Sequence, residues 1–314
     1  MSSTHLPISI QTDSAQPRTT SSASPVAART REQTIGLLLG VVAVAAFSLT
    51  FPMTRLALDG LAPLQVALGR AAIAALVALP LLCARRAPWP GWRLALRLAG
   101  VGLSVAVGFP ITIAWAMQAG SASQAGVILG LAPMATAAFA ALRYGERRSA
   151  RFWWMSGAAT LTVVLFAQHH GGGALRTRDA LLLLAVVFTA LGYSQGARLA
   201  HELPSVEVIA WAVLLVAPLT VPWALFELRT VATWPGAAAC GGLLYVGTIS
   251  QLLGFVPWYT GLALGGVTTV SQVQLLQPFL TFVAAALILG ESLPLELWGF
   301  GGLVALFVWV GRRA

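Results

Sequence analysis

The segments LAPMATAAFAALRYGERRSARFWWMSG (Leu131–Gly157) and LQPFLTFVAAALILGESLPLELWGFGG (Leu276–Gly302) decide the fold, because they are two copies of one pattern set 145 residues apart. They are identical at 10 of 27 positions. Matched alanines and leucines carry little weight in so apolar a chain. The informative matches are Pro133/Pro278, Thr136/Thr281, Gly145/Gly290, Glu146/Glu291, Trp153/Trp298 and Gly157/Gly302. A duplicated apolar half is typical of membrane proteins built from two structural repeats.

The composition places the chain in a membrane. Of its 314 residues 58% are hydrophobic and 9% are charged, and the mean hydropathy is +0.81. Soluble domains carry about 25% charged residues. Apolar runs of about 20 residues, each able to cross a hydrocarbon core about 30 Å thick, recur along the chain. Because that core holds no water for the backbone, the runs should be helices. We therefore predict an all-α membrane protein.

Ten spans are predicted, five in each half. They are Thr34–Met53, Leu64–Cys83, Leu98–Met117, Gln124–Leu142, Phe152–Gln168, Ala180–Leu199, Val208–Phe226, Ala237–Tyr259, Thr269–Leu289 and Leu293–Val310. Residues 34–172 should form the first repeat and residues 173–314 the second, within one membrane domain. Residues 1–33 are rich in Ser, Thr, Ala and Pro, so we expect a disordered cytoplasmic tail there.

The arginines predict the orientation. With a cytoplasmic N-terminus, 14 of the 19 arginines face the cytoplasm and four face the far side, which follows the positive-inside rule. An even number of spans puts both termini in the cytoplasm. Because five is odd, the second half must enter the membrane inverted relative to the first. Inverted repeats offer two near-equivalent conformations, one open to each side, with a binding site between them.

Pro133 and Pro278 fall near the middle of the fourth and ninth spans. Proline removes a backbone donor and frees a carbonyl of the preceding turn. Within a membrane, freed groups are tolerated only against protein or a water-filled cavity. We therefore predict paired kinks that line a central cavity or act as gates. Ordinary kinks of membrane helices are the alternative.

Polar side chains mark candidates for a substrate-binding cavity. Ser271, Gln274 and Gln277 lie three apart on one face of the ninth span. They either hydrogen-bond a polar ligand or join helices to one another. Span eight adds Ser250 and span six adds Thr189. The other candidates are Thr50, Trp115, Tyr193, Thr248, Gln251 and Trp258.

Arg70 is the one basic residue clearly inside a predicted span. A guanidinium is costly there and should face protein or water. It either neutralises an anionic group, such as a substrate carboxylate, or reaches the outer interface and pairs with Asp59. Its place near the outer end of the span favours the second alternative, and we keep Arg70 among the cavity candidates for the first.

Several classes of function lack support in the sequence. No acidic residue falls at a predicted midplane, so no carboxylate relay for proton coupling is visible. No enzyme, cofactor or metal motif is present, and Cys83 and Cys240 are too few for a disulfide framework. The arginines form no basic domain, so nucleic acid is not an expected partner. The expected partners are a small-molecule substrate and the lipid bilayer, and the oligomeric state stays open, a homodimer included.

Two stretches, Ala119–Gly157 and Ser250–Gly302, resemble the EamA-type transporters of the drug/metabolite transporter superfamily. Each carries a mid-helix proline followed about a dozen residues later by Gly-Glu: Pro133 with Gly145-Glu146, and Pro278 with Gly290-Glu291. The resemblance implies ten helices in two inverted five-helix repeats, located in a bacterial inner membrane. It also implies export of amino acids, metabolites or toxic compounds. The lysine often found near the end of the first helix in relatives is absent, and Arg55 stands close to its place.

The leading hypothesis is a secondary transporter that exports a small metabolite, such as an amino acid, by alternating access. A passive facilitator or channel for a small solute is the alternative. A membrane receptor without transport is a third hypothesis, and the sequence shows no soluble signalling domain that would support it.

Overall fold

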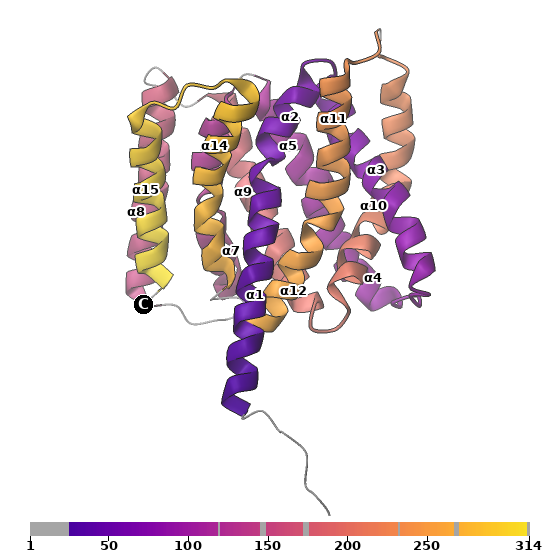
Figure 1. Ribbon diagram of the computed structural model, residues 1–314, viewed down its shortest axis with the longest axis horizontal. Coiled ribbons are helices and arrows are strands. Elements are labelled where there is room, and N and C mark those ends of the chain that lie inside the picture. The colour runs from indigo at the N-terminus through magenta and orange to yellow at the C-terminus, as the bar shows by residue number, and fades with distance from the viewer. Residues whose placement is uncertain are drawn as a thin grey trace, which may run out of the picture.

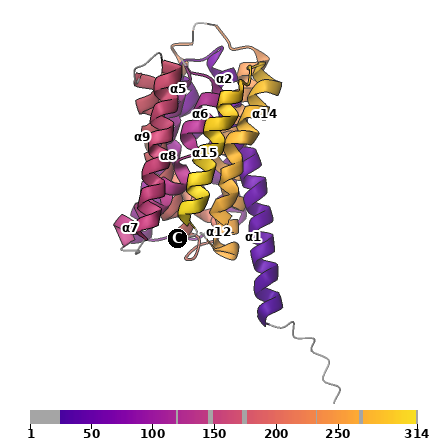
Figure 2. The same cartoon turned by 90° about the vertical axis from the view of Figure 1, so that its left-hand side faces the viewer.

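The structure, a computed structural model, is a bundle of roughly parallel helices (Figure 1). It describes residues 25–118, 120–144, 149–171, 176–231, 233–266 and 270–312, and this part of the chain contains helices and loops without a strand. The all-α prediction is confirmed. α1 begins at Pro25, nine residues before the expected first span, and its first turns project beyond the bundle (Figures 1 and 2). The rest of the predicted tail, residues 1–24, lies outside the described residues.

The helices of the first half are interrupted at three points. They are α1 (Pro25–Ser48), α2 (Thr50–Leu58), α3 (Pro63–Ala84), α4 (Trp92–Gly102), the π-helix η1 (Leu103–Gly108), α5 (Phe109–Met117), α6 (Ala122–Leu129), α7 (Ala132–Tyr144) and α8 (Ala150–Gly171). The interruptions separate α1 from α2, α4 from α5 and α6 from α7. Each pair of fragments occupies the place of one predicted span.

The second half has its own interruptions. Its helices are α9 (Thr177–Leu199), α10 (Ser205–Leu228), α11 (Ala237–Tyr245), the π-helix η2 (Val246–Leu253), α12 (Phe255–Gly265), the 3-10 helix η3 (Ser271–Leu276), α14 (Gln277–Leu289) and α15 (Leu295–Arg312). In the described part of the chain, seven helices are long and apolar enough to cross a membrane, and Val273–Leu289 and Leu295–Gly311 are shorter apolar helices. That all ten predicted spans cross the bilayer stays a prediction.

The two halves pack against each other in a symmetric pattern. α3 packs against α10 and α8 against α15, and each of these pairs joins equivalent helices of the two halves. α6 packs against α14, and their equivalents, η3 and α7, also contact each other. α1 packs against α12, and its equivalent, α9, packs against α5. Exchanging the halves leaves this set of pairs unchanged, as a two-fold relation requires. In Figure 1, α8 and α15 form one edge of the bundle, and α3 and α10 lie at the other.

The π-helices occupy equivalent places in the repeat. In η1 the amide of Phe109 donates to the carbonyl of Ser104, five residues back. The amide of Gly254, 145 residues after Phe109, donates to the carbonyl of Ile249 at 2.7 Å. Pro110 and Pro257 follow within the next turns. π-Bulges concentrate at functional sites because they leave carbonyls without a regular partner.

Side chains of the second half satisfy carbonyls that are freed in the first half. The carbonyl of Val105 loses its regular donors, since the amide of Phe109 bonds elsewhere and Pro110 has none. It accepts from Gln251 Nε2 at 2.9 Å. Pro52 leaves the carbonyl of Ser48 without its regular donor, and Thr281 Oγ1 donates to that carbonyl at 3.1 Å. These bonds tie the two halves together at the points where helices break.

Thr281→Val is therefore expected to destabilise the protein by about 1–2 kcal/mol, because the carbonyl of Ser48 is left unsatisfied in a medium without water. Thr160→Val is the matched control, since the exposed Thr160 hydroxyl only donates to the carbonyl of Ser156 in its own helix. Unfolding of both variants in mixed micelles provides the measurement. Equal stability of the two variants would show that the hydrogen bond between the halves contributes nothing.

Glu291 joins the end of α14 to the start of α6. Its carboxylate accepts hydrogen bonds from the amides of Ala122 (2.8 Å) and Ser123 (3.1 Å) and from Ser123 Oγ (2.6 Å). A carboxylate at a helix N-terminus satisfies orphan amides and complements the helix dipole. Gly290 adopts φ +67°, which turns the chain so that Glu291 reaches α6. The equivalent Glu146 lies outside the described residues.

Candidate functional site

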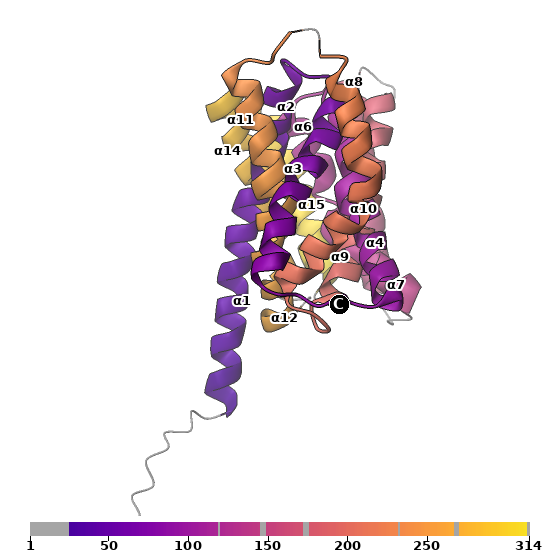
Figure 3. The same ribbon diagram turned by 90° about the vertical axis from the view of Figure 1, so that its right-hand side faces the viewer.

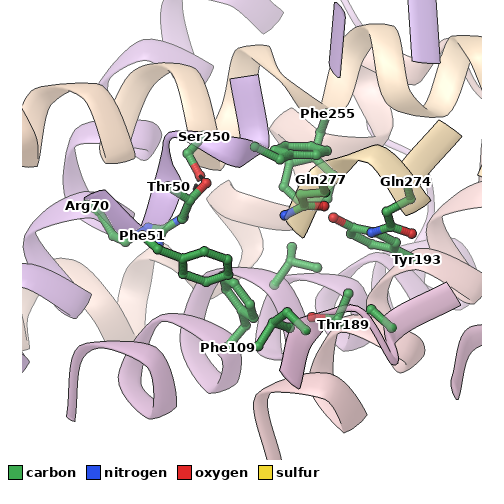
Figure 4. Close-up of a pocket in the computed structure, with 14 residues that line it drawn as sticks. Thr50, Phe51, Arg70, Phe109, Thr189, Tyr193, Ser250, Phe255, Gln274 and Gln277 are labelled. Carbon is green, nitrogen blue, oxygen red and sulfur yellow. Dashed lines mark hydrogen bonds between the residues drawn. The ribbon is translucent and has the colours of Figure 1, made fainter. Parts of the chain in front are cut away.

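A cavity lies between the two halves of the bundle (Figure 4). The first half contributes α1, α2, α3, η1, α5, α6 and α7, and the second half contributes α9, η2, α12, η3 and α14. The lining residues are Phe47, Thr50, Phe51, Arg70, Val105, Phe109, Leu129, Ala132, Thr189, Tyr193, Ser250, Phe255, Gln274 and Gln277.

The helix interruptions gather around this cavity. Thr50 follows the break between α1 and α2, Val105 lies in η1, and Ser250 lies in η2. Gln274 and Gln277 flank the junction of η3 with α14. Irregular backbone at membrane depth is tolerated where it is buried in protein or lines a cavity. The placement of the interruptions thus marks this cavity as the polar centre of the bundle.

Arg70 forms one end of the cavity, together with Thr50 and Ser250 (Figure 4). Its side chain is 2% exposed, and its Nη2 donates to Ser250 Oγ at 3.2 Å. The hydroxyls of Ser250 and Thr50 share a hydrogen bond of 2.8 Å. The guanidinium carbon lies 5.9 Å from the centre of the Phe109 ring, and Nε is buried without a hydrogen-bond partner.

The interfacial alternative for Arg70 is wrong. Asp59, the expected partner, instead pairs with Arg55 at 3.3 Å, and both of those side chains are largely exposed. No acidic residue is within ion-pair distance of Arg70 in the described part of the chain. The sequence did not reveal this because depth along a span does not determine which neighbour a side chain meets.

Gln274, Gln277 and Tyr193 lie toward the other end of the cavity (Figure 4). The segment before Gln277 is a 3-10 helix, in which residues three apart eclipse one another, so the shared polar face persists in a different helix type. The side chain of Ser271 lies outside the described residues. The first-half equivalents Leu129 and Ala132 also line the cavity.

Aromatic rings enclose this second end. Phe47, Tyr193, Phe255 and Trp258 form one cluster with ring centroids 5.1–6.3 Å apart. Trp258 is 1% exposed, and its indole nitrogen is buried without a partner. It supports the rings that line the cavity and is not itself part of the lining.

Three other candidates lie away from the cavity surface. Trp115 is 46% exposed and is not part of the cavity lining. Thr248 donates to the carbonyl of Leu244 in its own helix at 2.7 Å. Gln251 is fully buried, and its amide holds the freed carbonyl of Val105. These three placements correct the prediction that the side chains line the cavity.

The paired prolines start helices next to the cavity. Pro278 is the second residue of α14, and Pro133 is the second residue of α7, each directly after an interruption. Their neighbours Gln277 and Ala132 line the cavity. The helix breaks predicted at both prolines are present in the structure, and a gating role stays a prediction.

Sequence reasoning missed the apolar part of the lining, above all Phe47, Phe51, Phe109 and Phe255. No signal in the sequence separates these rings from lipid-facing ones, because both occur in apolar spans. Their neighbours give the only pointer, since Phe51 follows Thr50 and Phe109 precedes Pro110.

Comparison with known proteins identifies the family. The model of the EamA-like transporter family matches the chain twice, over residues 34–168 and 177–310. The chain belongs to the EamA-like transporter family. The uncharacterized transporter YdeK of Bacillus subtilis (strain 168) is 40% identical over 282 residues, which cover 89% of this chain and 98% of YdeK. A crystal structure titled only as that of a protein aligns with a TM-score of 0.60 at 19% identity, over 90% of this chain and 96% of the other. That structure shows a shared fold.

Membership of this family indicates a multi-pass membrane transporter of a small molecule and points to a transporter rather than to an enzyme. The two matched regions cover the two predicted repeats nearly end to end. The cavity lies between those regions and draws residues from both.

Proposed function

We propose that this EamA-family protein is a secondary transporter that exports a small metabolite by alternating access, with the central cavity as its binding site. The observation that carries the proposal is a cavity lined from both halves at the points where their helices break. A substrate held there contacts both repeats. Movement of one repeat against the other then exposes it to one side of the membrane or the other.

An arrangement of ten spans in two inverted repeats follows from the same proposal. The symmetric helix pairs and the two π-helices set 145 residues apart support a two-fold relation between the halves. With five spans in each half, the two-fold axis lies in the plane of the membrane. The inward-open and outward-open conformations then have similar free energies, so neither is strongly favoured without substrate.

The proposed location is a bacterial inner membrane with both termini in the cytoplasm. The first turns of α1 and the end of α15 lie at the same end of the bundle, which fits an even number of spans (Figure 1). The bias of 14 arginines against four supports assigning that end to the cytoplasm. Export is then movement away from the arginine-rich side.

Counterflow in proteoliposomes tests the proposal. The purified protein is reconstituted, and uptake of labelled solutes is followed for phenylalanine, leucine and the two 2-oxo acids of the same carbon skeletons, phenylpyruvate and 4-methyl-2-oxopentanoate. We expect saturable uptake of at least one solute, accelerated when the same unlabelled solute fills the vesicles. A carrier shows this acceleration because return of the loaded site is faster than return of the empty one.

The possible results separate the alternatives. Uptake that rises linearly with concentration and ignores internal solute indicates a channel, and would overturn alternating access. Empty liposomes report leakage through the lipid. Absence of protein-dependent uptake of all four solutes would count against the cavity as a site for small amphipathic metabolites.

A further inference from the structure

We propose that the substrate is an organic monoanion with an apolar body, so that each transport cycle carries one negative charge across the membrane. The inference rests on the proposed function and names the substrate class and the driving force of the same site. Three features of the structure carry it: a buried guanidinium without a counter-charge among the described residues, a described lining without a carboxylate, and a second, arginine-lined cavity near the end of α9.

Arg70 requires a negative charge that none of the described residues supplies. Arg70 is 2% exposed, and the described partners of its guanidinium are neutral. Nη2 lies 3.2 Å from Ser250 Oγ, and the guanidinium carbon lies 5.9 Å from the centre of the Phe109 ring. Nε has no partner at all. A buried charge that is neither paired nor fully hydrogen-bonded is costly. A carboxylate in the cavity removes this cost and gains the planar, charge-assisted hydrogen bonds that guanidinium groups form.

The described lining of the cavity offers no negative charge to a cation. None of the described residues that line it is acidic. The α-ammonium of an amino acid would meet only the amides of Gln274 and Gln277 and the hydroxyls of Thr50, Thr189 and Tyr193. The cavity should therefore bind an organic anion more tightly than a zwitterion of the same shape. The phenyl rings of Phe47, Phe51 and Phe255 suit the apolar remainder of such a molecule.

A second cavity supplies an electrostatic approach to the first. Its charged lining residues are Arg97, Arg143 and Arg198, and Arg97 also forms an ion pair with Glu202 at 2.7 Å. Figure 3 shows α4, α7 and α9 reaching the end of the bundle where α1 begins. Arg198 lies five residues after Tyr193 on α9, about 8 Å along the helix axis. Three arginines against one carboxylate, that of Glu202, leave this cavity with an excess of positive charge, and such a cavity concentrates anions.

The membrane potential drives an anion in the proposed direction. When the cell interior is negative, moving one negative charge outward releases about 2.3 kcal/mol per 100 mV. At equilibrium this energy corresponds to an outside-to-inside concentration ratio of about 50-fold. Export then needs no coupled ion. This fits the placement of the described acidic residues. Glu32 lies at the start of the first apolar span, and the others lie at helix ends or in loops: Asp59, Asp179, Glu202, Glu207, Glu227, Glu291 and Glu296.

The test uses the full-length protein in proteoliposomes with a potassium gradient and valinomycin to set the potential. Phenylpyruvate and 4-methyl-2-oxopentanoate are the anionic probes; both are fully ionised at neutral pH. Phenylalanine and leucine are their zwitterionic matches. At about 100 mV, interior positive, we expect the 2-oxo acids to accumulate up to about 50-fold and the amino acids not to accumulate. Reversing the potential should empty the vesicles of the 2-oxo acids.

The outcomes keep the two proposals apart. Saturable counterflow of phenylalanine or leucine without potential-dependent accumulation of either 2-oxo acid overturns the anion inference and leaves the transporter proposal standing. Accumulation of a 2-oxo acid that ignores the potential also overturns it. Absence of counterflow for all four solutes overturns both.

Substitutions assign the effect to the guanidinium. Arg70→Gln should lower the affinity for the 2-oxo acid at least tenfold and abolish its preference over the amino acid, whereas Arg70→Lys should keep the preference. Arg55→Gln is the matched control, because Arg55 is only partly buried and pairs with Asp59 outside the cavity. Thermal stabilisation of the detergent-solubilised protein by each probe provides a second reading that does not require transport. Equal stabilisation of the parent and Arg70→Gln proteins by phenylpyruvate would exclude Arg70 as the anion site.

Discussion

Gly102→Ala is expected to lower the free energy of unfolding by about 2–3 kcal/mol, although alanine is the better helix former. Gly102 ends α4, where this helix crosses α10. A Cβ atom there would overlap the backbone carbonyl of Ala212 and lie 2.9 Å from Val216 Cγ1. A backbone atom cannot rotate away as a side chain does. The two helices must therefore separate, and the core residues packed between them lose their contacts.

Gly157→Ala is the matched control for this prediction. Gly157 lies inside α8, and a Cβ atom there would meet nothing within 4 Å. Alanine should leave stability unchanged or raise it by up to about 1 kcal/mol, because it loses less backbone entropy than glycine. Unfolding in mixed micelles measures both variants. A Gly102→Ala protein as stable as the Gly157→Ala protein would show that α4 and α10 are free to move apart.

The same close approach recurs between α1 and α12, so the bundle depends on it in more than one place. A Cβ atom on Gly36 would lie 2.6 Å from the Cα of Gly265 and 2.9 Å from the carbonyl oxygen of Gly261. Lipid is as apolar as the helix surface, so helices in a membrane associate through close packing and hydrogen bonds. Small residues at these crossings supply the packing, and Gln251 and Thr281 supply the hydrogen bonds.

Much of the fold is predictable from the sequence, because the bilayer restricts backbone structure to helices of known length. Periodicity does not reveal where those helices break. The sequence predicts kinks at Pro133 and Pro278, and the near-equivalent Pro110 and Pro257 suggest a second pair of bends. The structure adds a break beside Pro52. The π-helices near Pro110 and Pro257 depend on partners in the other half, such as the amide of Gln251 for the carbonyl of Val105. Such partners are visible only after the halves are packed.

The candidate site is predictable to the extent that polarity identifies it. Thr50, Arg70, Tyr193, Gln274 and Gln277 were selected as polar groups in apolar spans, and the structure brings all five to one cavity. The same criterion selected Gln251 and Thr248, which satisfy backbone carbonyls instead. One span alone does not show whether a polar side chain faces a cavity or a freed carbonyl. Polarity does not identify the aromatic lining residues, because aromatic side chains also occur on surfaces that face lipid.

Replacing both Gln274 and Gln277 with leucine is expected to reduce the ratio kcat/KM for transport by about 10- to 1,000-fold. Both side chains line the cavity, and neither amide bonds to another side chain of the described residues. Their hydrogen bonds are therefore available to a ligand. Each such bond in a desolvated site contributes about 1–2 kcal/mol, and every 1.4 kcal/mol is a tenfold change. Leucine has nearly the volume of glutamine, so the fold should persist.

Gln118→Leu is the matched control, because Gln118 is exposed at the end of α5, outside the cavity. Counterflow with whichever solute shows saturable uptake gives kcat and KM for the three proteins, and the melting temperature in detergent reports folding. Loss of transport with an unchanged melting temperature assigns the face of η3 and α14 to substrate binding. Equal kinetics in the double variant and the control would instead mean that substrate passes without contact with this face. The binding role would then fall to Arg70, Thr50 and Ser250 at the opposite end of the cavity.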